Sequence, residues 1–134
     1  MNNNLKLTFK SLILVSLLSI IVACTTSTSQ TVEVVEPQEF KDALNKHPQA
    51  LLLDLRTPEE FQDAHLSNAI IIDFESDDFE SQLKSAVDTT SIVFIYCRTG
   101  NKSGQTNTML QDMKIDTIIE LNGGYESWQE QFEN

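Results

Sequence analysis

The sequence of 134 residues contains little cysteine, little glycine and little positive charge. Its two cysteines, Cys24 and Cys97, are too few for a disulfide framework. His47 and His65 stand apart from the cysteines, so no cluster has the spacing of a zinc site. No apolar run reaches the roughly 20 residues that a membrane-spanning helix needs. We therefore expect no metal, no other cofactor and one ordinary hydrophobic core.

Positive charge is scarce, with 9 Lys and Arg against 20 Asp and Glu. Lys6 and Lys10 lie within the first 23 residues and all the acids follow, so residues 24–134 carry a formal charge of −13. Nucleic-acid binding depends on Lys and Arg that neutralise phosphates, and this charge argues against it. It also argues against electrostatic attraction to anionic lipid, and favours a soluble, self-repelling surface.

The first 23 residues resemble a secretory signal. Residues 1–10 contain two lysines and no acid, and residues 11–23 are apolar and end on Ala23. An uncleaved membrane anchor is the alternative.

Residues 21–24, Ile-Val-Ala-Cys, resemble the lipobox of bacterial lipoproteins. The resemblance implies that Cys24 receives a diacylglyceryl group and that the chain is cut just before it. Several acyl chains would anchor the protein stably to a membrane, with its domain at the bacterial cell envelope, outside the cytoplasm. Whether this is the inner or the outer membrane stays open.

Three regions follow from these patterns. Residues 1–23 form the signal peptide, and residues 24–33 form the lipidated cysteine with a tether of small polar residues. Residues 34–134 form a single domain.

Within the domain, short apolar runs alternate with amphipathic stretches. Strands are expected at residues 32–35, 50–55, 69–72, 91–96 and 117–121, and helices at 37–46, 79–87, 103–113 and 125–132. A further helix should begin after Thr57, because Thr57, Pro58 and Glu60 form a capping box with proline at the first helical position. The alternation predicts an α/β fold with a mainly parallel sheet flanked by helices. In such sheets, ligands bind beyond the carboxyl ends of the strands.

One such end carries a cysteine in a polar loop. Residues 92–96 form an apolar strand, and Cys97 follows it directly. The backbone N–H groups of the loop and the start of a helix at Ser103 can hold an anion. Arg98 and Lys102 add positive charge, and Gly100 permits unusual torsions. These features favour a thiolate or a persulfide at Cys97. A cysteine that merely packs at the strand end is the alternative.

The loop at residues 97–103, Cys-Arg-Thr-Gly-Asn-Lys-Ser, closely resembles the active-site loop of rhodanese domains. Residues 53–61 with His65, and residues 121–124 with Trp128, resemble the flanking signatures of that family. The resemblance implies a three-layer fold and a sulfurtransferase. Cys97 would take a sulfane sulfur from a small anionic donor such as thiosulfate and pass it to a thiol or cyanide-like acceptor. We expect the donor to be bound by the rest of the loop: Arg98, Thr99, Gly100, Asn101, Lys102 and Ser103.

Other positions are expected to support the loop. Asp54 and Arg56 should form a structural pair or hold the active loop, and neither is predicted to be catalytic. Ala64 and Asn68 stand where the family usually has glycine. These two differences put the family's local loop geometry in doubt here, but not its fold. Lys102 replaces the commoner arginine and so lacks its bidentate fork.

Three alternatives to a sulfurtransferase remain. A cysteine phosphatase needs arginine six residues after the cysteine, where this chain has Ser103. A persulfide carrier or sulfur-sensing module would also keep Cys97 but would turn over slowly. An inactive structural domain would more often lack the cysteine. Once Cys24 is lipidated, residues 24–134 contain no second free cysteine to resolve an oxidised Cys97, so an unidentified sulfur-relay or reducing partner is expected.

Overall fold

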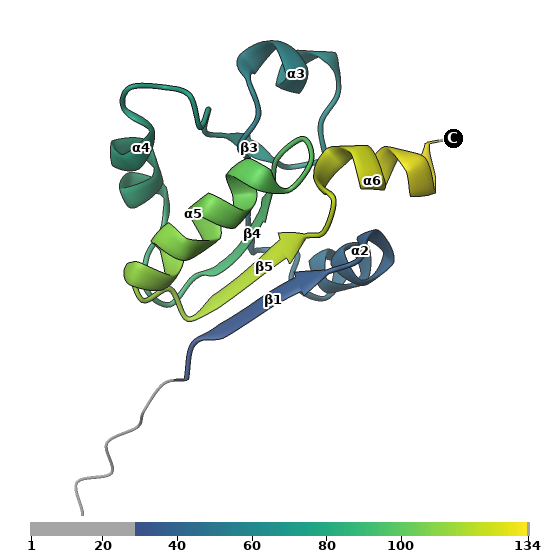
Figure 1. Ribbon diagram of the computed structural model, residues 1–134. Helices are drawn as coiled ribbons and strands as arrows, with labels where there is room; N and C mark the ends of the chain where they lie inside the picture. Colours follow the sequence, from purple (N-terminus) through teal and green to yellow (C-terminus); the bar gives the residue numbers. More distant parts are fainter. Residues whose placement is uncertain (1–28, 134) are drawn as a thin grey trace, which may run out of the picture.

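The computed structural model describes residues 29–133, so the predicted signal peptide and Cys24 lie outside the described residues. Figure 1 shows a single parallel sheet between helices. The strands are β1 (Thr31–Val35), β2 (Leu51–Asp54), β3 (Ile70–Ile71), β4 (Ile92–Tyr96) and β5 (Thr117–Leu121), in the order β1-β5-β4-β2-β3. The helices are α2 (Pro37–Lys46), α3 (Pro58–Asp63), α4 (Phe79–Ala86), α5 (Asn101–Asp112) and α6 (Gly124–Phe132). The predicted α/β fold with a parallel sheet is confirmed.

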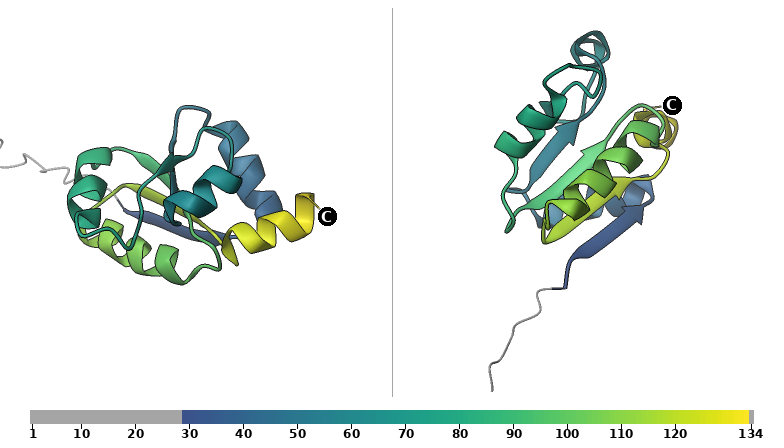
Figure 2. Two further views of the ribbon diagram at one scale, coloured as in Figure 1. Left: turned by 90° about the horizontal axis from the view of Figure 1, so that it is seen from above. Right: turned by 60° about the vertical axis from the view of Figure 1, so that its left-hand side comes forward.

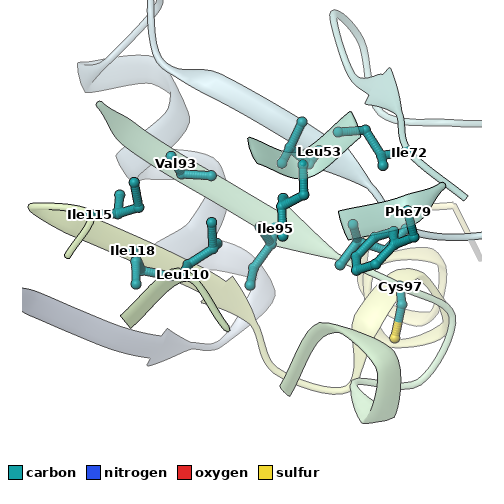
Figure 3. Packing of buried hydrophobic residues seen from close by; sticks show 11 residues of the cluster. Leu53, Ile72, Phe79, Val93, Ile95, Cys97, Leu110, Ile115 and Ile118 are labelled. Atoms are coloured by element: carbon teal, nitrogen blue, oxygen red, sulfur yellow. The ribbon is translucent and has the colours of Figure 1, made fainter. Parts of the chain in front are cut away.

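Two hydrophobic clusters hold the helices on opposite faces of the sheet (Figure 2). On one face, Phe79 and Leu83 of α4 and Leu110 of α5 pack on Val93 and Ile95 of the central strand (Figure 3). On the other face, the cluster joins α2 and α6 to the strands through Phe40, Leu52, Phe94, Leu121 and Tyr125. Successive strand residues point to opposite faces, which is why Val93 and Phe94 belong to different clusters. The result is the three-layer arrangement expected from the sequence.

Several boundaries differ from the sequence-based expectation. β1 begins at Thr31, inside the stretch assigned to the tether. α5 begins at Asn101 and not at Ser103, because Gly100 adopts a left-handed φ of 98° and turns the chain directly into the helix. Lys102 and Ser103 therefore belong to the first turn of this helix.

The two positions that lack the usual glycine are accommodated in different ways. Asn68 adopts a φ of 65°, a left-handed conformation that asparagine tolerates better than most residues. Ala64 ends α3 with a φ of −162°, which is extended backbone open to any residue.

Within residues 29–133, no helix is both long enough and apolar enough to cross a bilayer.

Candidate active site

Cys97 lies at the carboxyl end of the central strand β4, between β5 and β2 in the sheet. The residue is only 1% exposed, and its carbon atoms belong to the hydrophobic cluster drawn in Figure 3. Its Sγ accepts a hydrogen bond from the Gly100 N–H at 3.2 Å, and the Ser103 Oγ lies 3.6 Å away. The fold therefore aims a backbone donor from the start of α5 at the sulfur, which stabilises negative charge there.

Cys97 also lines a cavity of about 470 Å³. The other residues around it are Arg56, Thr57, Glu60, Glu75, Arg98, Thr99, Asn101 and Lys102. Four of the six predicted donor-binding residues, Arg98, Thr99, Asn101 and Lys102, thus surround the cavity. Gly100 contributes its backbone N–H to the sulfur, whereas Ser103 is fully buried behind it.

Both cations of the loop are paired with carboxylates that the sequence analysis did not anticipate. Lys102 Nζ lies 2.6 Å from Glu75 Oε1, and Arg98 Nε lies 2.7 Å from Glu126 Oε1. The hydrogen bond from Arg98 to Glu126, and then the charge of that carboxylate, raise the pKa of the guanidinium. Arg98 is 69% exposed, so its ion pair is weak and readily exchanged for a ligand. The cavity is therefore less positive than the loop sequence indicates.

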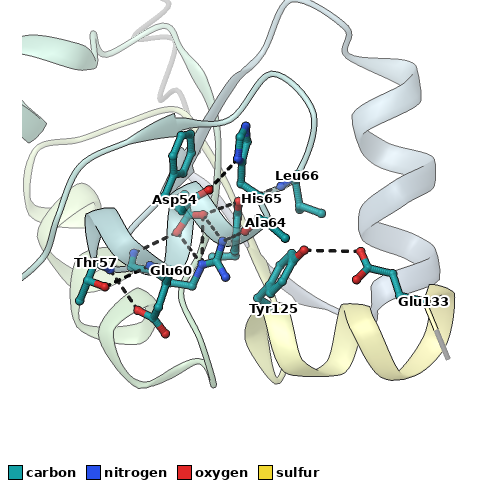
Figure 4. Close-up of polar contacts among 11 residues, drawn as sticks. Asp54, Thr57, Glu60, Ala64, His65, Leu66, Tyr125 and Glu133 are labelled. Atoms are coloured by element: carbon teal, nitrogen blue, oxygen red, sulfur yellow. Dashed lines mark hydrogen bonds and ion pairs between the residues drawn. The ribbon is translucent and has the colours of Figure 1, made fainter.

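Asp54 and Arg56 form the predicted pair, which is buried where β2 ends and the loop to α3 begins (Figure 4). The guanidinium contacts both carboxylate oxygens and donates to the Ala64 carbonyl at 2.6 Å. Burial alone would lower the pKa of Arg56, but the hydrogen bond with Asp54 and its charge outweigh burial and raise it. An Arg paired in this bidentate way is a rigid connector.

Tyr96 links this pair to the catalytic strand. Its hydroxyl donates to Asp54 Oδ2 at 2.6 Å and accepts from the Leu66 N–H at 3.2 Å. Burial, followed by the hydrogen bond to Asp54, raises the pKa of Tyr96, so the hydroxyl stays protonated as a donor. Since Tyr96 immediately precedes Cys97, its hydroxyl connects the Asp54–Arg56 pair to the strand that carries Cys97.

The turn between β5 and α6 holds the loop from the other side. The Tyr125 N–H donates to the Cys97 carbonyl at 2.8 Å, and the Glu126 N–H donates to the Arg98 carbonyl at 3.1 Å. Gly124 has a φ of 64°, and a Cβ at this position would come within 2.5 Å of the Cys97 carbonyl oxygen. The second glycine of the turn is thus required by a close approach to the active loop.

Glu120 and Asn107 are further residues of the site that the sequence analysis missed. Glu120 Oε1 accepts from Ser103 Oγ at 2.7 Å, and its Oε2 accepts from Asn107 Nδ2 at 2.8 Å. All three residues are buried. The signal in the sequence was a carboxylate inside the apolar strand Thr-Ile-Ile-Glu-Leu. Such a side chain must have partners in the fold.

Among residues 29–133, no three His, Cys, Asp or Glu side chains come together as possible metal ligands. A second hollow, of about 490 Å³, lies at the opposite end of the strands beside Ile92 and His47. None of the residues that line it is a cysteine.

Comparison with known proteins connects this geometry to a family. The family model described as "Rhodanese-like domain" matches residues 36–131. The "Adenylyltransferase and sulfurtransferase MOCS3" of Caenorhabditis briggsae is 37% identical over 109 residues, which cover 75% of this chain and 26% of that protein. "Thiosulfate sulfurtransferase 16, chloroplastic" of Arabidopsis thaliana is 28% identical over 85 residues, which cover 57% of this chain and 71% of that protein.

A crystal structure of a rhodanese-related protein from Thermoplasma volcanium superposes with a TM-score of 0.64 at 20% identity. The match covers 75% of this chain and 93% of that structure, and it shows the shared fold. The chain spans 22% to 56% of the length of the first curated relatives that it matches. Since the family model covers most of the residues that the structure describes, the chain belongs to the family of rhodanese-like domains.

Proposed function

We propose that the protein is a sulfurtransferase that carries a sulfane sulfur on Cys97 as a persulfide. The observation that carries the proposal is the position of Cys97 Sγ. It follows the central strand, lines a cavity and accepts the Gly100 N–H at 3.2 Å. A sulfurtransferase needs an anionic sulfur that a small donor can reach, and these contacts favour that state.

In the first half-reaction, the Cys97 thiolate attacks the outer sulfur of a donor such as thiosulfate. A new S–S bond forms at Cys97, the S–S bond of thiosulfate breaks, and sulfite leaves with the electron pair. In the second half-reaction, a thiol or cyanide-like acceptor attacks the outer sulfur of the persulfide and releases the Cys97 thiolate. No external oxidant or reductant is consumed, and the covalent intermediate divides one transfer into two steps.

The second candidate is a persulfide carrier or sensor with little turnover. The observation that favours it is the pairing of Lys102 with Glu75 and of Arg98 with Glu126. A small anionic donor must displace these carboxylates before it meets the cations. A sulfur-relay partner that delivers a protein-bound persulfide needs no such displacement, and it could also keep Cys97 reduced.

The test is the intact mass of the purified protein after exposure to thiosulfate or to polysulfide, followed by cyanide. A gain of one sulfur that cyanide removes, with thiocyanate released over many turnovers, supports the sulfurtransferase. A stable gain with little turnover supports the carrier. The control is Cys97→Ser, which leaves Cys24 in place; a sulfur gain of equal size on this variant rules out Cys97 as the carrier.

We further propose that Cys24 is lipidated and anchors the domain at the bacterial cell envelope. The support is the sequence alone: an apolar stretch at residues 11–23 that ends directly before Cys24. The described residues add one geometric consequence. β1 starts at the end of the sheet opposite to Cys97, because it runs parallel to β5 and β4 (Figure 1). An anchor before Thr31 would therefore hold the end of the sheet that is remote from the cavity.

The anchor can be tested by the mass of the amino-terminal peptide purified from membranes. A peptide that begins at Cys24 and carries acyl chains supports the proposal. An unmodified peptide that contains residues 11–23 supports the uncleaved anchor instead.

A further inference from the structure

A buried carboxylate stands directly behind the reactive cysteine. Glu120 lies on β5, is 5% exposed and faces the first turns of α5. Among residues 29–133, no Lys or Arg forms an ion pair with it. Its carboxylate is held instead by two neutral donors, the Ser103 hydroxyl at 2.7 Å and the Asn107 amide at 2.8 Å. A buried charge without a cation depends on every one of its hydrogen bonds.

The direction of these hydrogen bonds is fixed by a neighbouring amide. Asn107 Oδ1 accepts from Gln111 Nε2 at 2.9 Å, so the Asn107 Nδ2 group must face Glu120 as a donor. Both carboxylate oxygens of Glu120 are acceptors, Oε1 from Ser103 Oγ and Oε2 from Asn107 Nδ2. Ser103 is consequently the donor in its contact with Glu120.

Ser103 has one hydroxyl proton and three neighbours that could accept it. They are Glu120 Oε1 at 2.7 Å, the Gly100 carbonyl at 3.2 Å and Cys97 Sγ at 3.6 Å. The carboxylate is the nearest, and a hydrogen bond to a charged oxygen is stronger than one to a neutral carbonyl. The Ser103 proton therefore points at Glu120, and an oxygen lone pair is left toward the sulfur.

We propose that Glu120 is a positioning residue that acts on Cys97 through Ser103. Because Ser103 donates its hydroxyl proton to Glu120, it can only accept a hydrogen bond from Cys97. This arrangement stabilises the thiol of Cys97 and gives its thiolate no hydrogen bond from the hydroxyl. The Gly100 N–H then remains as the donor to the thiolate. The functional meaning rests on the proposed role of Cys97: Glu120 restrains the nucleophile and sets how readily it takes up sulfur.

The substitution Glu120→Gln reverses this arrangement while keeping nearly the same shape. The new amide oxygen must face Asn107 Nδ2, because that group can only donate. The new amide nitrogen must then face Ser103 and donate to its oxygen. This frees the Ser103 proton to turn toward Cys97 Sγ and to stabilise the thiolate. We expect Cys97 to be alkylated about five-fold faster at neutral pH, the size of effect expected for one added hydrogen bond.

The experiment compares four proteins: the native chain, Glu120→Gln, Ser103→Ala and the double variant. Each is alkylated with iodoacetamide between about pH 5 and about pH 9, across the range in which thiols ionise. The adduct is measured on the peptide that contains Cys97, which separates it from Cys24. Iodoacetamide is uncharged, so it reports the thiolate and not the charge of the cavity. The charged side chains that face the thiol across the cavity are the same in all four proteins: Arg56, Glu60, Glu75, Arg98 and Lys102.

The expected result is a faster reaction of Glu120→Gln, with the acid limb of its profile at lower pH. In the Ser103→Ala background, the same substitution should add nothing, since the hydroxyl through which it acts is gone. Equal acceleration in both backgrounds would mean that Glu120 acts by its charge alone and would overturn the proposal. No acceleration in a variant whose circular dichroism and melting match the native protein would overturn it too.

Ser103→Ala alone keeps the proposal testable if Glu120→Gln does not fold. Because Ser103 does not donate to the thiolate in the native protein, its removal should not slow the alkylation of Cys97. A fall of about five-fold or more would show that the hydroxyl already supports the thiolate and would overturn the proposal. Alkylation needs no sulfur donor, so this outcome is independent of whether the protein transfers sulfur.

Discussion

The Nζ of Lys102 lies 2.6 Å from the Glu75 Oε1, at the edge of the cavity that contains Cys97. Lys102 is 28% exposed and Glu75 is 63% exposed, so water and salt weaken the pair but do not remove the acid from the entrance. Glu60 places a second carboxylate in the same lining. The charge that a donor meets is thus set by acids outside the loop as much as by the loop itself.

The first prediction concerns Glu75. Glu75→Gln removes a negative charge that competes with anionic donors for Lys102, so kcat/KM for thiosulfate should rise by about two- to five-fold. A neutral organic trisulfide should gain less. The measurement is thiocyanate formation with each donor. Glu80→Gln is the matched control, because Glu80 pairs with Lys84 on α4 outside the cavity. Equal gains for both donors, or for the control, would contradict this role of Glu75.

The second prediction concerns Arg98. Its side chain lines the cavity and exchanges Glu126 for a ligand at little cost. Arg98→Ala should lower kcat/KM for thiosulfate by about five-fold or more, since a charged hydrogen bond to the donor is lost. The neutral trisulfide should be affected less, and Lys84→Ala should change neither donor. Equal losses for both donors would show that Arg98 shapes the loop and does not recognise charge.

Features of this site whose partners lie close together in the sequence could be predicted, whereas contacts between residues far apart in the sequence could not. The capping box of Thr57 and Glu60 was predicted because its partners lie three residues apart, and it is present in the structure. Glu75 and Glu126 could not be assigned to the site, because only the fold brings them to Lys102 and Arg98. Glu120 was missed for the same reason: its partner Ser103 is on another element.

The start of α5 shows a second limit of sequence reasoning. The sequence was interpreted as a helix from Ser103, but the left-handed Gly100 starts the helix at Asn101. Ser103 then lies in the first turn of α5, where it is fully buried behind the sulfur. Helix ends are the least sharply defined parts of a helical pattern, so the side chains near them are the hardest to place from the sequence.

The third prediction concerns Tyr96, whose hydroxyl joins Asp54 to the Leu66 N–H. Tyr96→Phe leaves both groups without this partner and should lower the free energy of unfolding by about 1–3 kcal/mol. Burial and the hydrogen bond to Asp54 raise the pKa of Tyr96 in the folded state. Its contribution is therefore complete below the unfolded pKa of about 10 and is lost as pH rises above it.

Urea unfolding at several pH values tests this prediction. The difference in stability between the native protein and Tyr96→Phe should be constant from about pH 7 to about pH 9 and should shrink above about pH 10. A difference that grows with pH would mean that Tyr96 ionises more easily in the fold than outside it.

The fourth prediction concerns Gly124, which lies against the backbone of the active loop. Gly124→Ala places a methyl group against the backbone of Cys97 and Arg98, within 2.5 Å and 2.6 Å, at a φ of 64°. The turn and the active loop cannot separate without breaking hydrogen bonds, because the N–H groups of Tyr125 and Glu126 donate to the Cys97 and Arg98 carbonyls. Stability should fall by about 2–4 kcal/mol, and sulfur loading of Cys97 should fall with it as the loop is displaced.

Gly104→Ala is the matched control: its Cβ would meet only Glu120 Oε1, at 3.8 Å, inside the regular helix α5. There the same methyl group should be neutral or stabilise by up to about 1 kcal/mol. Urea unfolding and intact mass after exposure to the donor distinguish the two, and similar losses at both positions would show that the turn does not hold the active loop in place.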